Sequence, residues 1–264
     1  MSDESGTGQR ERTGNPVAPL TPNASLRYDV ISRLLPPNIQ DVLEVGCGQG
    51  AAGLRLARRY SYVGVEPDHA SWSVARRRFA ALGSGEVHNT TIGGLDENLR
   101  FDVVCAFEVL EHIEDDAAAL AEWRQRLRPD GWLLLSVPAH QTRYGPADEL
   151  VGHFRRYDAE DLTGLLVRCG FDEISVRHYG FPLGYLLESG RNRIAARRLR
   201  STGDASVAER TAGSGRLLQP SGRLRGAATH GATLPFQLLQ RAFPNLGTGL
   251  VVRARRTAEP GQLT

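Results

Sequence analysis

The sequence of 264 residues contains no lysine, so all 32 of its basic residues are arginine. This absence excludes Schiff-base catalysis and a P-loop, because both need a lysine side chain. Cysteine is also scarce: Cys47, Cys105 and Cys169 are odd in number and have no Cys-x-x-Cys spacing. Neither a disulfide framework nor a zinc site is therefore indicated, and a reducing compartment is predicted.

Long apolar segments and a strong net charge are missing too. No run of about 18 apolar residues occurs, and the polar N-terminus lacks the apolar centre of a signal peptide. The formal net charge is only +2, whereas nucleic-acid binding usually requires a clustered positive excess. We therefore predict a cytoplasmic protein that has no membrane span and does not bind nucleic acid.

Most of the chain alternates short apolar runs with longer amphipathic segments. Strands are expected at 41–45, 62–65, 86–89, 101–106, 132–137 and 173–178, and helices at 23–35, 51–60, 70–82, 115–127 and 159–169. Asn23 or Ser25 is expected to cap the first helix. Strands separated by helices indicate right-handed β-α-β units, and hence a doubly wound α/β fold with a mainly parallel sheet. Ligands then bind at the carboxyl ends of the strands.

Composition divides the chain into four segments. They are a disordered tail at 1–22, a ligand-binding core at 23–180, a helical insertion at 181–246 and a last strand with a tail at 247–264. Two apolar pieces of the insertion flank a stretch rich in arginine, glycine and serine, 191–231, which we expect to be a mobile loop. Two interpretations of the insertion stay open: a lid over a hydrophobic substrate, or a cap over the sheet edge. Its arginines could also contact an anionic membrane surface.

The stretch VLEVGCGQGAAG, residues 42–53, carries two overlapping glycine fingerprints. The dinucleotide fingerprint G-x-G-x-x-G fits Gly48, Gly50 and Gly53. The fingerprint E-x-G-x-G-x-G, which indicates S-adenosylmethionine, fits Glu44, Gly46, Gly48 and Gly50. The first fingerprint should follow its strand directly, and here it would leave Gly46 and Cys47 as surplus loop. The second is therefore favoured, because glycines at its positions let the backbone approach a ligand closely with positive φ.

Two carboxylates accompany this loop. Glu66 ends the second strand, 20 residues beyond Gly46, where a carboxylate can bind both ribose hydroxyls of a nucleoside. Glu66 is common to both fingerprints and does not discriminate between them. Glu44 is placed to accept a hydrogen bond from the ammonium group of S-adenosylmethionine, directly or through water.

The segment FDVVCAFEVLEHIEDD, residues 101–116, supplies the discriminating pattern. Together with the glycine loop it closely resembles the class I S-adenosylmethionine-dependent methyltransferases, particularly the group that contains the ubiquinone and menaquinone O- and C-methyltransferases. The resemblance extends from Tyr28 to His178 and implies a Rossmann-like sheet of seven strands, the last one antiparallel and formed by 249–253. It also implies S-adenosylmethionine as cofactor, with Phe107 and Glu108 lining its methionine end.

The sequence departs from the family pattern after the third strand, where relatives often carry an Asp that contacts adenine. Here the chain has VHNTTIGG instead. Thr90, or one of its neighbours Asn89 and Thr91, must then take the place of that Asp, and we assign the contact to Thr90.

Two histidines are candidate catalytic residues. Methyl transfer mainly requires alignment, and a base is needed only when the nucleophile must lose a proton. His112, which follows the fourth strand, is the first candidate because imidazole titrates near neutral pH. The alternative is a structural histidine. His153 is the second candidate, in a polar segment of residues 138–162 where Arg155 and Arg156 suggest an acidic group on the substrate.

The segment after the fourth strand also contains candidate metal ligands. Glu108, Glu111 and His112 form an E-x-x-E-H set similar to that of the metal-dependent small-RNA 2′-O-methyltransferases, and His140 or His153 would be needed as a fourth ligand. Carboxylate and histidine clusters often occur without a metal, so none is predicted.

We therefore predict an S-adenosylmethionine-dependent methyltransferase that acts on a small molecule, more often at oxygen than at carbon or nitrogen. An NAD-dependent oxidoreductase and a non-catalytic methyltransferase-like binding protein are the alternatives. The sequence leaves open which acceptor is used and what oligomeric state the protein has.

Overall fold

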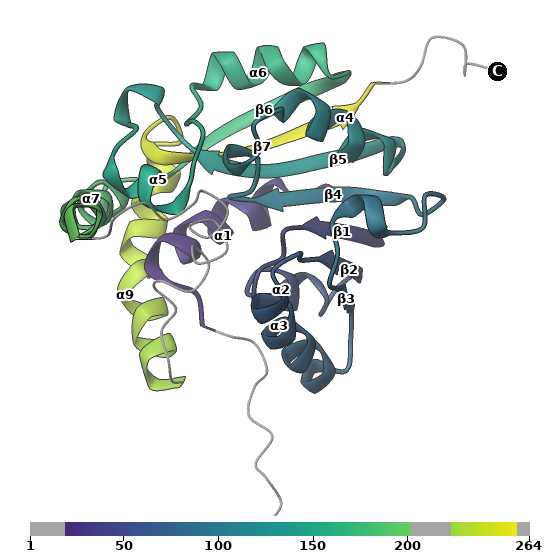
Figure 1. The fold of residues 1–264 in the computed structure, drawn as a ribbon, viewed down its shortest axis with the longest axis horizontal. Helices are drawn as coiled ribbons and strands as arrows, with labels where there is room; N and C mark the ends of the chain where they lie inside the picture. The colour runs from purple at the N-terminus through teal and green to yellow at the C-terminus, as the bar shows by residue number, and fades with distance from the viewer. Residues whose placement is uncertain (1–18, 202–222, 258–264) are drawn as a thin grey trace, which may run out of the picture.

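The computed structural model describes residues 19–201 and 223–257, and its centre is one seven-stranded sheet (Figure 1). The strands are β1 (Asp41–Val45), β2 (Ser61–Val65), β3 (Glu86–His88), β4 (Phe101–Phe107), β5 (Leu127–Pro138), β6 (Phe171–Gly180) and β7 (Gly247–Arg256). Their order in the sheet is β3-β2-β1-β4-β5-β7-β6. β7 runs antiparallel to β5 and β6, and the other pairings are parallel. The predicted doubly wound, mainly parallel sheet is confirmed.

The helices cover both faces of the sheet. They are α1 (Pro22–Leu34), α2 (Gly53–Leu56), α3 (His69–Leu82), α4 (Asp116–Gln125), α5 (Pro146–Val151), α6 (Ala159–Arg168), α7 (Leu183–Ser201) and α9 (Arg223–Ala242). Short 3₁₀ turns occur at η1 (Ile92–Gly94), η2 (Leu110–His112) and η3 (Gln141–Arg143). α4 and α6 pack on one face, and α1, α2 and α3 pack on the other.

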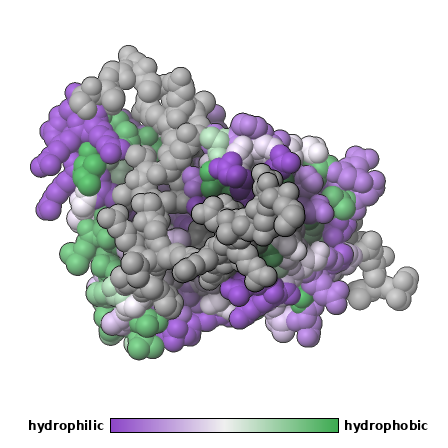
Figure 2. All heavy atoms as spheres, turned by 90° about the horizontal axis from the view of Figure 1, so that it is seen from below, coloured by the Kyte–Doolittle hydropathy of each residue, from purple (hydrophilic) through white to green (hydrophobic). Residues whose placement is uncertain are grey.

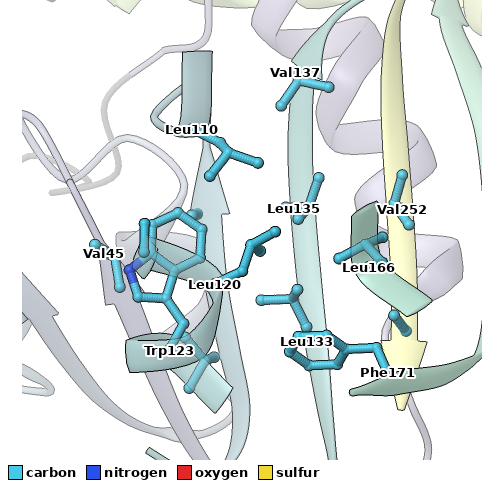
Figure 3. Packing of buried hydrophobic residues seen from close by; sticks show 14 of the residues in the cluster. Val45, Leu110, Leu120, Trp123, Leu133, Leu135, Val137, Leu166, Phe171 and Val252 are labelled. Atoms are coloured by element: carbon cyan, nitrogen blue, oxygen red, sulfur yellow. The ribbon is translucent and has the colours of Figure 1, made fainter. Parts of the chain in front are cut away.

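Alternating side chains of the strands build the two cores. In Figure 3, Leu120 and Trp123 of α4 lie on the β4 side of the β5 residues Leu133 and Leu135, and Leu166 of α6 lies on their β7 side. All five side chains are at most 1% exposed. Burial of each large apolar side chain contributes about 1.5–3 kcal/mol. The central strands are apolar on both faces, as expected of a parallel sheet covered by helices, and this core holds the strand ends in fixed positions.

Helix α9 of the insertion lies alongside α1 (Figure 1). Gln237 donates a hydrogen bond to Ser25 Oγ at 3.0 Å, and Gln240 donates one to the carbonyl of Leu26 at 3.0 Å. Arg241 forms an ion pair with Asp29. α9 is thus held against α1 by two buried hydrogen bonds and one exposed ion pair.

Apolar side chains remain exposed on the insertion. Leu186 of α7 is 72% exposed and Leu238 of α9 is 62% exposed. Figure 2 shows apolar residues gathered at the end of the molecule where α7 and α9 lie in Figure 1. Both interpretations of the insertion, a lid and a cap, stay predictions.

Two local expectations are wrong. α1 begins at Pro22 and is capped by Thr21, whose Oγ1 accepts a hydrogen bond from the Ala24 amide at 3.2 Å, so neither Asn23 nor Ser25 is the cap. Proline fits the first position of a helix because its missing N–H would have no partner there. The described structure begins at residue 19, within the predicted tail of residues 1–22. Residues 1–18 lie outside the described residues.

The stretch 191–231 is also helical at both ends, within α7 and α9, where we expected a loop. The glycine and serine content was misleading, because alanine, arginine and leucine, which dominate 194–200, all favour helix. Residues 202–222 of this stretch lie outside the described part of the chain. No helix in that described part is long and apolar enough to cross a bilayer.

Candidate active site

The order of the strands places the candidate site. The chain moves outward from β1 to β2 and β3, and then returns to the other side of β1 to form β4 and β5. Where the direction reverses, the loops after neighbouring strands diverge and leave a crevice at their carboxyl ends. The residues that follow β1, β2, β4 and β5 therefore form the candidate active site.

The loop after β1 needs its glycines for two different reasons. Gly46, Gly48 and Gly50 have φ values of 66°, 54° and 79°, a left-handed region that other residues rarely adopt. A Cβ on Gly46 would lie 2.7 Å from Cγ2 of Val109, in the loop after β4. A Cβ on Gly48 would meet nothing within 4 Å. Gly46 thus allows two loops to pack together, and Gly48 leaves backbone open to a ligand.

Glu66 follows β2 and directs its carboxylate toward this loop. Oε2 accepts a hydrogen bond from the Gly48 amide at 2.8 Å, and Oε1 accepts one from the Asp68 amide at 2.8 Å. Burial raises the pKa of Glu66, although both hydrogen bonds lower it. A carboxylate can accept about four hydrogen bonds, so two acceptor positions remain. That number suits the two ribose hydroxyls, and the predicted role of Glu66 stays a prediction.

Asn89, after β3, supports Glu66. Its side-chain amide donates to the carbonyls of Glu66 and Pro67 at 2.8 and 3.0 Å. Its Oδ1, the atom that could accept a hydrogen bond from the adenine amino group, lies 3.0 Å from Nδ1 of His69, so Asn89 is not available for adenine. Thr90 beside it is half-buried and keeps its predicted role as the adenine contact.

Glu44 is less accessible than its predicted role requires. It is only 3% exposed, and its Oε2 accepts a hydrogen bond from the Tyr62 hydroxyl at 2.6 Å. Burial raises the pKa of Glu44 to about 7, although the bond from Tyr62 and the charge of Arg27 lower it. The carboxyl lies beneath the glycine loop, close to Gly53, so contact with an ammonium group would have to be made through water. This role also stays a prediction.

Phe107 is the last residue of β4, and the backbone changes direction at Glu108. Phe107 is buried, and Glu108 has a φ of 59°, which is rare for a residue with a side chain. Glu108 Oε1 accepts hydrogen bonds from Ser136 Oγ at 3.0 Å and from the Tyr179 hydroxyl at 3.1 Å. It also lies 3.4 Å from Nη1 of Arg27. Burial would raise the pKa of Glu108, but Arg27, His153 and these hydrogen bonds hold it below its usual value.

The loops after β4 and β5 bring the two candidate histidines together with Glu111. The rings of His112 and His153 meet edge to face, with centroids 4.6 Å apart. His153 Nε2 lies 3.8 Å from Glu111 Oε1. His140, the other histidine considered with this set, lies elsewhere, with its Nε2 3.0 Å from the carbonyl oxygen of Gly247.

His112 is a poor match to the predicted base. Burial and the neighbouring His153 lower the pKa of its ring to about 4, although Glu108 and a hydrogen bond with the Gly152 backbone raise it. The ring is therefore neutral at pH 7 and does not titrate near neutrality, as the sequence interpretation assumed. Its Nδ1 is buried and has no hydrogen-bond partner among the described residues. His112 thus offers a lone pair, but it is a weak base.

A buried ion network holds His153 in place. Asp148 Oδ1 lies 2.8 Å from His153 Nδ1, and Arg156 donates to Asp148 Oδ2 at 2.6 Å. Arg156 also pairs with Glu188 of α7, which accepts a second hydrogen bond from Arg143 at 2.8 Å. Burial would raise the pKa of Asp148, but His153 and Arg156 lower it to about 2. Sequence reasoning missed Asp148 and Glu188, because neither stands in a recognisable motif.

The proposal that the arginine pair binds an acidic substrate group is wrong for this arrangement. Arg156 is 5% exposed and neutralises Asp148 and Glu188. Arg155 pairs with Asp116 at 2.6 Å and donates to the carbonyl of Glu114. Both guanidinium groups are therefore engaged inside the protein.

Fold and site together define a class of protein. A doubly wound domain with a glycine loop after β1 and a carboxylate after β2 is built to bind a ligand that contains a nucleoside. A family model described as a methyltransferase domain matches residues 23–176, more than half of the chain. The chain belongs to this methyltransferase domain family. The family predicted from the sequence, that of the S-adenosylmethionine-dependent methyltransferases, is confirmed.

Individual relatives agree with this membership. A protein of Mycobacterium tuberculosis named "Probable S-adenosylmethionine-dependent methyltransferase" is 31% identical over 156 residues, which are 57% of this chain and 56% of that protein. A ubiquinone biosynthesis O-methyltransferase of Xylella fastidiosa is 32% identical over 127 residues, 46% of this chain and 51% of that protein. The chain thus spans about half the length of the curated relatives it matches.

Solved structures agree at the level of the fold. The N-methyltransferase NodS of Bradyrhizobium japonicum, in complex with S-adenosylhomocysteine, superposes with a TM-score of 0.55 at 16% identity and covers 90% of this chain and 89% of that chain. The YcgJ protein of Bacillus subtilis gives a TM-score of 0.58 at 14% identity, with 89% and 99% covered. At these identities the likeness concerns the fold alone.

Proposed function

We propose that this protein transfers the methyl group of S-adenosylmethionine to a hydroxyl oxygen of a small molecule. One observation carries the choice of oxygen. Glu111 and His112, in the loop that packs on Gly46, place buried lone pairs without hydrogen-bond partners close to His153. A hydroxyl nucleophile needs such groups because it must lose its proton, whereas a neutral amine can attack with its own lone pair.

A relative supports the same choice. The ubiquinone biosynthesis O-methyltransferase of Xylella fastidiosa acts, by its name, at oxygen, and its similarity covers 46% of this chain. A small-molecule acceptor fits the formal net charge of only +2, because proteins that act on nucleic acid usually carry a strong positive excess. The unpaired cysteines are consistent with the predicted cytoplasmic location, which stays a prediction.

The reaction then divides between two parts of the site. The glycine loop and Glu66 hold the nucleoside, and Glu108 lies at the methionine end, so that the sulfonium methyl is directed toward the acceptor. An oxygen lone pair attacks the methyl carbon, a C–O bond forms as the C–S bond breaks, and the released electron pair stays on sulfur. The sulfonium becomes the neutral thioether of S-adenosylhomocysteine. As the C–O bond forms, the hydroxyl proton passes to a lone pair of the Glu111, His112 and His153 cluster and from there to solvent.

Calorimetry and isotope labelling test this proposal. We expect the protein to bind S-adenosylmethionine and S-adenosylhomocysteine but not NAD; tight binding of NAD would contradict the proposal. S-adenosylmethionine labelled with ¹³C in its methyl group, added with the protein to a small-molecule extract, should yield a methyl carbon resonance typical of an ether or ester oxygen. A resonance typical of N- or C-methyl would refute the choice of oxygen, and binding without any labelled product would favour the non-catalytic alternative.

A further inference from the structure

We propose that Glu188 of α7 is a positioning residue for His153, and that the loop between β5 and α6, residues 139–158, is ordered only while α7 is docked against it. Helix α7 then controls the acceptor side of the site and leaves the cofactor side unchanged. The consequence for methyl transfer rests on the proposed function. α7 lies beyond residue 176, where the match to the methyltransferase domain family ends, so this support comes from outside the family domain.

One side of α7 contacts the β5–α6 loop. Tyr185, Glu188 and Asn192 are three and four residues apart, so they lie on the same face of the helix. The guanidinium group of Arg143 lies over the Tyr185 ring, 4.8 Å from its centroid. Asn192 Oδ1 accepts a hydrogen bond at 3.1 Å from the amide of Ala147, in the first turn of α5, where amides have no partner within their own helix. α5 and α7 thus lie side by side (Figure 1).

Glu188 supplies the charge that balances the buried network of this loop. It is 2% exposed, and its two carboxylate oxygens accept hydrogen bonds from Arg156 and Arg143. To this network the loop itself contributes the two guanidinium groups and the carboxylate of Asp148, so without α7 one positive charge has no counterpart. A buried charge that lacks a partner is costly. The ordered loop is therefore favoured when Glu188 is in place.

The network reaches His153 through two intervening side chains. Arg156 donates to Asp148 Oδ2 from Nε at 2.9 Å and from Nη2 at 2.6 Å, and Asp148 Oδ1 lies 2.8 Å from His153 Nδ1. Burial would raise the pKa of Asp148, but His153 and Arg156 lower it to about 2, so the carboxylate is ionised at neutral pH. An ionised carboxylate can only accept, so Nδ1 of His153 carries the proton in this contact. Glu188 thus helps to fix the orientation and the tautomer of the ring.

The ends of the loop are held by other contacts. The amide of His140 donates to the Tyr157 carbonyl, and the amide of Tyr157 donates to the Pro138 carbonyl, both at 3.0 Å. These bonds join the two ends of the loop next to β5 and do not involve α7. Release of α7 should therefore loosen the middle of the loop, which contains His153, and leave β5 and the glycine loop as they are.

Amide hydrogen exchange, measured by NMR on the full chain, tests the inference. The amides of His153 and Phe154 donate to the carbonyls of Asp148 and Glu111 at 2.9 and 2.8 Å. In Glu188→Gln both amides should exchange about 10–100-fold faster, because opening the loop no longer breaks hydrogen bonds between charged groups.

Controls show whether the effect is local. The amide of Gly50, in the glycine loop, should exchange in Glu188→Gln as it does in the wild type, and affinity for S-adenosylmethionine should change by less than about threefold. Arg193→Gln, on an exposed side of α7, is the matched control and should change neither quantity. If Glu188→Gln folds poorly, Asn192→Ala on the same face of α7 should show the same local effect at a smaller size.

A double variant separates charge balance from packing. Arg143→Gln combined with Glu188→Gln removes one charge of each sign, so that Arg156 and Asp148 balance each other. Exchange at the His153 amide should then return to within about threefold of the wild type. The Nδ1–H resonance of the His153 ring, which fast exchange should weaken in Glu188→Gln, should return as well. A double variant that is perturbed as much as Glu188→Gln would mean that Glu188 only fills space, and would overturn the inference.

Two further results would also overturn it: unchanged exchange at His153 in Glu188→Gln, or an equal acceleration at Gly50. Methyl transfer from ¹³C-labelled S-adenosylmethionine is followed in parallel, and Glu188→Gln should lose product while it still binds the cofactor. Product from the wild type together with an undisturbed loop in Glu188→Gln refutes this inference alone. A loosened loop in Glu188→Gln without any product from the wild type refutes the proposed function alone.

Discussion

The glycine loop with Glu66 and the cluster of Glu111, His112 and His153 lie at the same edge of the sheet but are built differently. In the first, the acceptor atoms already have donors: Glu66 accepts from two backbone amides, and Glu44 accepts from Tyr62. In the second, the contact with Asp148 holds His153 in place, while the carboxylate oxygens of Glu111 and Nδ1 of His112 have no hydrogen-bond partners within the described residues. The polar groups of the loop are thus satisfied by the protein itself, whereas those of the cluster are not.

The largest effect on stability is expected when the buried ion network that holds His153 in place is broken. Arg156→Met removes the cation that two buried carboxylates share, which leaves Asp148 with His153 and Glu188 with Arg143, and it should lower the free energy of unfolding by about 3–5 kcal/mol. Arg155→Met is the matched control, because Arg155 pairs with Asp116 nearer the surface and should cost at most about 1 kcal/mol. Urea unfolding measures both. Equal losses in the two variants would mean that the network does not support the cluster.

The variant Glu66→Ala tests whether the glycine loop and Glu66 bind the cofactor. Two charge-assisted hydrogen bonds to ribose are worth about 1.5–3 kcal/mol each, so we expect S-adenosylmethionine affinity to fall by about 100-fold or more. The control is Glu86→Ala, on the exposed start of β3, which should bind normally. Calorimetry gives both affinities, and a change of less than threefold in Glu66→Ala would show that Glu66 does not bind the cofactor.

The dependence of stability on pH tests Glu44, the buried carboxyl beneath the glycine loop that accepts a hydrogen bond from the Tyr62 hydroxyl. Burial raises the pKa of Glu44 from 4.5 to about 7, so the folded protein takes up a proton that the unfolded chain has lost. The contribution of Glu44 to the free energy of unfolding should therefore fall by about 3 kcal/mol as the pH rises from about 4.5 to about 7. Glu44→Gln should remove this contribution, so the measured quantity is the difference in slope between the two proteins. In both proteins Glu111, whose pKa is also raised, acts in the same direction, and His112, whose pKa is lowered to about 4, acts in the opposite direction. An identical slope in Glu44→Gln would contradict the assignment.

The smallest expected difference is that between two glycines of one loop. Gly46→Ala and Gly48→Ala both place a side chain in left-handed backbone, at a cost of about 1–2 kcal/mol. Gly46→Ala should cost about 1 kcal/mol more, because its methyl group meets Val109. Gly48→Ala should instead weaken cofactor binding more than its stability loss explains. Thermal unfolding measures the stability of the two variants, and calorimetry measures their affinity for the cofactor. If both quantities are the same in the two variants, Gly46 and Gly48 do not differ in the way we propose, one in packing and the other in ligand access.

Much of the fold follows from local patterns in the sequence. The strands expected at 41–45, 62–65 and 101–106 match β1, β2 and β4 to within one residue at each end. The alternation of strand and helix led to the correct sheet, because buried parallel strands are apolar and short. The errors arose where composition was used in place of propensity, as at 191–231, or where a cap depends on how a helix begins, as at Thr21.

Only part of the candidate site could be predicted from local sequence patterns. Gly46, Gly48, Gly50 and Glu66 lie close together in sequence or at the ends of adjacent strands, so their proximity could be predicted. Glu111 and His153 are 42 residues apart, and their meeting depends on the path of the chain between β5 and α6. The role of Arg156 was misjudged because burial converts a candidate substrate contact into an internal countercharge.

By itself, the sequence determined the fold, the family and the position of the glycine loop, because short-range periodicity and glycine spacing act along the chain and need no knowledge of distant contacts. Tertiary structure decided which polar groups are satisfied and which are not. Whether Glu111 has a partner, whether His112 titrates near pH 7 and whether Arg156 faces substrate all depend on desolvation and on neighbours from other elements. Those quantities exist only once the loops after β4 and β5 have come together.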